Sequence, residues 1–291
     1  RPYPGGVTTM ASPRTAIAVI AAPSWLVWIF RVNLIVQVGI VVTGGLVRLT
    51  GSGLGCPTWP ECVDGSLVPT SRQEEAWHKY VEFGNRTLTF LLGVAAIAAL
   101  AGALLWWQRS RSRGLPGRGP VIALAAVPLL GTVAQAVLGG ITVLTGLHPI
   151  IVAAHFLLSI GIIAGCVLLV DRAQDPDDQP VTPLVRRTLV VLGDVLVATA
   201  FLVLVLGTIV TGAGPNSGDS DVTHRLGIDQ RVAAWIHADI VYLFVGLIIA
   251  MALALHLVNG PATARRREWQ LIALVVANGV LGYLQLFLGL P

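Results

Sequence analysis

Residues 151–170 read IVAAHFLLSIGIIAGCVLLV, twenty consecutive residues without an aspartate, glutamate, lysine or arginine. Coiled into an α-helix at about 1.5 Å per residue, this stretch spans about 30 Å, the thickness of the hydrocarbon core of a bilayer. Backbone N–H and C=O groups in lipid must be hydrogen-bonded inside the protein, and a helix achieves this within one segment. The stretch therefore predicts a transmembrane helix.

Similar apolar runs recur along the chain of 291 residues, of which 55% are hydrophobic and 12% charged. A soluble domain carries about twice that charged fraction. We predict an all-α polytopic membrane protein with seven transmembrane helices, near residues 25–47, 83–107, 120–144, 151–170, 188–210, 233–257 and 270–289. The net charge of +4 comes from arginines between the runs, so it indicates topology rather than nucleic-acid binding.

The basic residues between the runs alternate in density. Segments 108–119, 171–187 and 260–268 carry ten arginines, whereas the other three connections carry five basic residues. Cytoplasmic loops of membrane proteins are enriched in lysine and arginine. We therefore expect these segments and the N-terminal segment 1–24 in the cytoplasm of a multi-pass cell-membrane protein, with the loop after the first run outside.

That exterior loop contains GGLVRLTGSGLGCPTWPEC at residues 44–62, rich in turn-forming glycine and proline. Its cysteines, Cys56 and Cys62, face an oxidising compartment, where cysteine pairs form disulfides. We expect a disulfide that shapes or regulates a lid. A plain staple or two free thiols are the alternatives, because spacing alone does not define geometry.

The chain also contains an internal repeat. VVTGGLVRLTGSG at 41–53 resembles IVTGAGPNSG at 209–218, and LGGITVLTGLHP at 138–149 resembles LGYLQLFLGLP at 281–291. The pattern predicts two related four-helix bundles with a pseudo-twofold axis along the membrane normal. Such bundles build cofactor sites between facing helices.

We assign the first half to residues 25–170, a cytoplasmic linker to 171–187 and the second half to 188–291. The second half contains three predicted helices. The repeat offset would place an equivalent of His155 six or seven residues past Pro291, so we expect an eighth helix with a histidine near its outer end.

Two histidines lie one turn inside predicted helices, His155 in AAHFLL and His237 in WIHADI. Ionisable residues inside a membrane span are costly and usually functional. Imidazoles from facing helices are common haem ligands, so we expect iron ligation, with an interhelical hydrogen bond as the alternative. Three more histidines lie at the outer level, where a surface role and ligation both remain open: His78, His148 and His224.

The stretch HKYVEFGNRTLTF at 78–90 opens the second predicted helix. Glu82 and Asn85 are three residues apart and share a helix face, and His78 is on the same stripe if the helix starts early. Glu82 is either a catalytic group or an ion-pair partner. Three arginines at outer helix ends suit bidentate contact with carboxylates such as haem propionates: Arg48, Arg86 and Arg225.

These motifs, GGLVRLTGSGLGCPTWPEC, VEFGNR and GLHPIIVAAHF, resemble the haem A synthases of the actinobacterial kind over about residues 25–291. The resemblance implies an enzyme that oxidises a methyl group of haem O to the formyl group of haem A by successive hydroxylations with oxygen from water. It assigns the family's cysteine pair, essential glutamate and two haem-ligating histidines to Cys56 and Cys62, Glu82, His155 and His237.

The resemblance also implies a division of labour, with the substrate haem in the first half and a haem b electron relay in the second. Haem O synthase and the cytochrome c oxidase assembly machinery are the implied partners, in membrane lipid, with homo-oligomerisation open. One departure is Asn85, where the family has a histidine; the first haem would then be bound through His155 alone, or through His78.

Two other classes remain open at this point. One is a haem-binding electron-transfer or quinol-oxidising protein without substrate chemistry. The other is a transporter, which predicts ionisable groups near mid-membrane, whereas here they cluster at the outer rim.

Overall fold

The computed structural model describes residues 21–115, 118–175, 183–215, 218–219 and 224–287. Within these ranges the chain is helical, and its only β-pairing is an isolated bridge between Val63 and Ser66. The helices are α1 (Ser24–Leu49), α2 (His78–Ser112), α3 (Gly119–Leu144), α4 (Pro149–Gln174), α5 (Arg187–Ala213), α6 (Gln230–Leu257) and α7 (Ala262–Phe287). The predicted all-α class is confirmed.

Six of these helices, α1 to α6, are long and apolar enough to cross a membrane. The chain is therefore a polytopic membrane protein, as predicted. The seventh predicted span, 270–289, falls on α7, and its last two residues lie outside the described ranges. Helix α2 begins at His78, five residues before the predicted span, and so carries Lys79 and Glu82 as helical residues.

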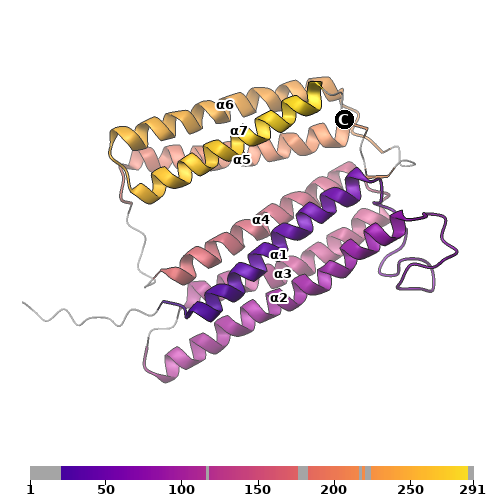
Figure 1. Ribbon diagram of the computed structural model, residues 1–291, viewed down its shortest axis with the longest axis horizontal. Coiled ribbons are helices and arrows are strands. Elements are labelled where there is room, and N and C mark those ends of the chain that lie inside the picture. The colour runs from indigo at the N-terminus through magenta and orange to yellow at the C-terminus, as the bar shows by residue number, and fades with distance from the viewer. Residues whose placement is uncertain (1–20, 116–117, 176–182, 216–217, 220–223, 288–291) are drawn as a thin grey trace, which may run out of the picture.

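The helices form two groups (Figure 1). Helices α1 to α4 make one bundle, α5 to α7 make a second group, and α4 packs against α5 where the groups meet. Residues 50–77, between α1 and α2, fold over one end of the first bundle. We call residues 50–77 the cysteine loop and this end of the molecule the loop end.

Buried apolar side chains gather at the end opposite the cysteine loop in both groups. In the first bundle, Leu26 and Phe30 of α1 pack with Leu169 of α4, all fully buried, and the small residues Ala99 and Ala103 of α2 allow close helix approach. The second group has a similar cluster around Ile248 and Met251. These filled ends hold the helices together and leave the loop end to carry the polar residues described below.

Candidate functional site at the loop end

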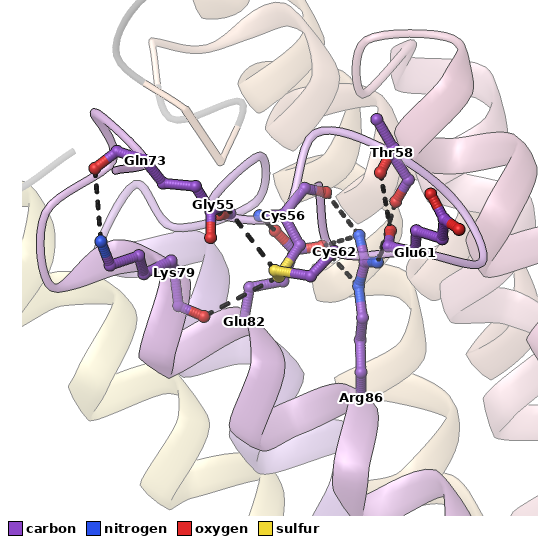
Figure 2. Close-up of polar contacts among 9 residues, drawn as sticks. All are labelled: Gly55, Cys56, Thr58, Glu61, Cys62, Gln73, Lys79, Glu82 and Arg86. Carbon is purple, nitrogen blue, oxygen red and sulfur yellow. Dashed lines mark hydrogen bonds and ion pairs between the residues drawn. A yellow bond between two sulfur atoms is a disulfide. The ribbon is translucent and has the colours of Figure 1, made fainter. Parts of the chain in front are cut away.

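Three side chains on one face of α2 hold the cysteine loop: Lys79, Glu82 and Arg86 (Figure 2). Their spacing of three and four residues aligns them along the helix. Glu82 is buried, with 5% of its surface exposed. Its Oε2 accepts a hydrogen bond from the Cys56 backbone N–H at 2.6 Å, and its Oε1 forms an ion pair with Arg86 Nη2 at 2.6 Å. The ion-pair alternative for Glu82 is thus observed.

Arg86 uses all three of its guanidinium nitrogens as donors, and two of them, Nη1 and Nη2, bond the loop. Nε donates to Glu82 Oε1 at 3.0 Å, and Nη2 donates to the Cys56 carbonyl as well as to Glu82. Nη1 donates to the carbonyl oxygens of Thr58 at 2.9 Å and Glu61 at 3.2 Å. In this arrangement Arg86 is an anchor that collects the turn between the two cysteines onto α2.

Cys56 and Cys62 form the expected disulfide, with their Cα atoms 4.3 Å apart and both side chains buried. Lys79 secures the later part of the loop, because its Nζ donates to the carbonyls of Thr70 at 2.8 Å and Gln73 at 3.3 Å. Gln73 in turn donates to the Gly55 carbonyl. The loop is therefore attached to α2 at several points between Cys56 and Gln73 (Figure 2).

Trp59 connects the cysteine loop to α3. A Cβ added at Gly140 would lie 2.3 Å from the Trp59 indole, so only glycine permits this contact. The Arg86 guanidinium lies 5.8 Å from the centre of the same ring, within reach of a cation–π contact. The neighbouring Gly139 packs on His155, with its added Cβ 3.2 Å from the imidazole Cε1. The cysteine loop thus contacts both the Glu82–Arg86 pair, called the clamp below, and α3, which packs with α4 around His155.

His155 and His237 occupy similar environments in the two halves. Each has a buried Nδ1 without a hydrogen-bond partner among the described residues, although the Val203 backbone is close enough to interact with His237. Each imidazole packs on a glycine of the preceding helix, Gly139 for His155 and Gly207 for His237. Because Nδ1 of each ring faces the glycine of the preceding helix, Nε2 is the ring nitrogen that would bind a haem iron, and iron ligation by either histidine stays a prediction.

Asn85 and His78 take different positions. Asn85 accepts a hydrogen bond from Thr43 Oγ1 of α1 at 2.7 Å. His78 lies at the start of α2, where its Nδ1 is 2.9 Å from the hydroxyl of buried Ser52 and its ring stacks on Trp77. The His78 contact joins the cysteine loop to α2, whereas the Asn85 contact joins α1 to α2 within the bundle. Iron ligation by His78 stays a prediction.

Arg48 and Arg225 lie at the contact between the halves. Arg48 Nη2 donates to the Thr211 carbonyl of α5 at 3.4 Å, and Arg225 donates to the carbonyl oxygens of Pro215 and His224. The two guanidinium groups are close enough to interact electrostatically. Anionic groups such as carboxylates suit this pair, and both halves contribute to it.

Sequence reasoning missed Lys79, Trp59 and the Gly139–Gly140 pair. The spacing of Lys79, Glu82 and Arg86 on one helix face was a usable signal for a clamp. Nothing in the sequence could have paired Trp59 with Gly140, because the residues are far apart in the chain. No cluster of three or more metal-ligating side chains occurs in the part of the chain that the structure describes.

Together these features define a polytopic helical membrane protein with a disulfide-bonded loop over one bundle and a partly buried histidine in each half. A family model described as cytochrome oxidase assembly protein matches residues 26–291, and the chain belongs to this family.

Similar proteins include three named heme A synthase. The one from Shewanella oneidensis is 27% identical over 57% of this chain and 53% of its own length. The one from Lysinibacillus sphaericus is 34% identical over 48% of this chain and 44% of its own length. The one from Methylobacterium sp. is 28% identical over 91% of this chain and 84% of its own length. The chain thus spans about half the length of the first two relatives.

Proposed function

We propose that this protein is a haem A synthase, which oxidises one methyl group of haem O to a formyl group. Each of two hydroxylations takes an oxygen atom from water and releases two electrons and two protons, and the resulting hydrate then loses water. Family membership and the relatives' names support the substrate class. The observation that carries the proposal is the cysteine loop, which joins buried Glu82 to the helix pair holding His155.

In this proposal the first half binds haem O, with His155 as the iron ligand. Trp59 and the disulfide-bonded turn cover the bundle beside it and exclude bulk water. Arg48 and Arg225 suit the propionates, since a guanidinium pairs well with a carboxylate. Arg86 has a different role here, because its donors already hold the loop.

Glu82 is the proposed catalytic residue. Removing hydride equivalents from the methyl group builds positive charge on its carbon, which a nearby carboxylate stabilises. The same carboxylate can accept a proton as water adds. Arg86 and the Cys56 N–H fix the position of the carboxylate, so no reorganisation is needed when the charge develops.

The second half is proposed to hold a haem b through His237. When bound there, the haem would supply one-electron redox chemistry. Gly207 lets the His237 imidazole lie close against α5, and the apolar cluster around Ile248 closes the far end of the group.

The test is to express the chain in cells that make haem O but lack their own haem A synthase, and to identify the extracted haems by chromatography. We expect haem A and its hydroxylated precursor from the unmodified protein. Glu82→Gln should keep its haem content and lose haem A formation by about 100-fold or more, as for removal of an acid–base group. The exposed Glu74 of the same loop provides the matched control, Glu74→Gln.

If the protein retains haem B alone and yields no oxidised product, the electron-transfer class replaces the synthase. If Glu82→Gln loses haem and activity in equal measure, Glu82 serves only to hold the loop.

A further inference from the structure

The interior of the first bundle contains a column of polar side chains below the site. Three interhelical pairs form it, with Asn33 Nδ2 donating to Cys166 Sγ, Gln37 Nε2 to Thr132 Oγ1, and Gln135 Nε2 to Ser159 Oγ, at 3.4, 3.2 and 2.6 Å. Polar side chains inside a membrane protein are costly unless they are hydrogen-bonded. Most polar groups of this column are hydrogen-bonded to a side chain of a neighbouring helix.

Gln135 is the exception nearest the site. Its Nε2 donates to Ser159 Oγ and also to the His155 backbone carbonyl at 2.9 Å. Because a carbonyl only accepts, the nitrogen of the amide must face α4, and the oxygen is therefore the atom left over. Gln135 Oε1 is buried and has no partner among the described residues. This amide oxygen can accept a hydrogen bond from an O–H or N–H donor of a bound molecule.

This acceptor lies one helical turn from the candidate iron ligand. Gln135 precedes Gly139, the residue against His155, by four positions, and Ser159 follows His155 by four. Four residues of helix advance about 6 Å. The oxygen of Asn33 is also buried and unpaired, but its partner Cys166 lies eleven residues beyond His155, near the filled end of the bundle.

We propose that Gln135 Oε1 accepts a hydrogen bond from the hydroxyl group of haem O and so selects haem O over haem B. Haem O differs from haem B by a hydroxyethylfarnesyl group in place of a vinyl group, and its hydroxyl is the one O–H donor on that edge. A site built to bond a hydroxyl rejects an analogue that lacks it, since the buried acceptor is then left unpaired. The inference rests on the proposed function and adds a specificity-determining residue to it.

An internal water is the other source of an O–H donor, and it would satisfy Oε1 whichever haem is bound. The two sources differ in one measurable respect. If the donor is the hydroxyl of haem O, replacing Gln135 lowers retention of haem O but not of haem B. If the donor is a water, the replacement does not distinguish the two haems.

The experiment purifies the protein from cells that make both haems, and quantifies farnesylated haem (haem O with its oxidised products) and haem B per protein. Gln135→Leu should lower farnesylated haem about tenfold, the value of one hydrogen bond with a buried partner, without lowering haem B. Ser159→Ala removes the partner of Nε2 but keeps Oε1, and should retain the preference.

Asn278→Leu is the matched control in the second half. Asn278 follows Gln135 at the repeat offset of 143 residues, is exposed, and bonds the Leu274 carbonyl of its own helix. It should change neither haem.

Parallel loss of both haems in Gln135→Leu, or an equal loss in Ser159→Ala, would assign Gln135 to helix packing and overturn the proposal. An unchanged haem ratio in Gln135→Leu would leave water as the occupant and overturn it too. Because farnesylated haem is counted whether or not it is oxidised, failure of catalysis and failure of selection give different results.

Discussion

The two halves share one arrangement and differ in what surrounds it. In each, a partly buried histidine packs on a glycine of the preceding helix, His155 on Gly139 and His237 on Gly207. The first half adds the clamped cysteine loop and the polar column. Aligning VTG at 42–44 with VTG at 210–212 gives an offset of 168 residues between α1 and α5, which matches Asn33 and Gln37 with Phe201 and Val205.

This difference matches the proposed division of labour. Chemistry on a substrate needs a covered site with fixed polar groups, because a positioned carboxylate acts only where charge develops. An electron relay needs an iron ligand in an apolar, closed environment, which tunes the haem by burial. Two halves that each hold a histidine in different surroundings are therefore suited to two different tasks.

The largest expected effect separates the halves by their histidines. His155→Ala and His237→Ala should each lose about half of the bound haem, since each removes one iron ligand of a different site. The haem lost should be farnesylated in the first variant and haem B in the second. Identical haem losses in the two variants would contradict separate sites.

The clamp is expected to contribute stability that the second half lacks. Arg86→Met leaves the Glu82 carboxylate buried without its ion-pair partner, which should cost on the order of 3 kcal/mol and expose the cysteine loop to protease. Thermal unfolding in detergent measures the cost. Arg109→Met, at an exposed position on the same helix, should stay within about 0.5 kcal/mol. Equal melting temperatures of the two variants would show that the Arg86–Glu82 ion pair does not stabilise the first half.

The Trp59 contact predicts a further effect confined to the first half. Gly140→Ala forces a methyl group against the indole, an overpacking that should cost about 1–3 kcal/mol and loosen the loop. The control is Gly93→Ala, where an added Cβ meets nothing within 4 Å. Limited proteolysis of the loop is the readout, and a loop equally protected in both variants would argue against the contact.

The glycines beside the histidines sharpen the comparison. An added Cβ would lie 3.2 Å from the His155 ring at Gly139 and 3.4 Å from the His237 ring at Gly207, but meets nothing within 4 Å at Gly39. Gly139→Ala should therefore shift the haem absorbance more than Gly207→Ala. Gly39→Ala, at the α1 position that matches Gly207, should leave the spectrum unchanged; a shift there equal to that of Gly139→Ala would refute the ranking.

The smallest effect concerns the contact between the halves at the end opposite the loop. Arg267 of α7 pairs with Asp171 of α4 at 2.8 Å, with 72% and 50% of their side chains exposed. Such a pair contributes at most about 1 kcal/mol and is screened by salt. Arg267→Ala should lower the melting temperature slightly in low salt and not in high salt. A large loss independent of salt would show that this contact matters more than the clamp.

The sequence anticipated part of the site because some of its geometry is local. The span of Glu82 and Arg86 is one helical turn, so their alignment follows from helical spacing alone. The cysteines are six residues apart, and their disulfide formed as expected. The role of Arg86 was not anticipated, because its partners Thr58 and Glu61 lie in a loop whose path over α2 depends on many contacts.

By itself, the sequence determined that this is an all-α membrane protein, since long apolar runs have one stable form in lipid. Only the tertiary structure decided which atoms are left without partners. The amide nitrogen of Gln135 bonds two groups of α4, which leaves its buried oxygen as an acceptor without a partner among the described residues. Its sequence position alone shows only a helical glutamine. Such a group depends on the packing of several helices, which no local pattern encodes.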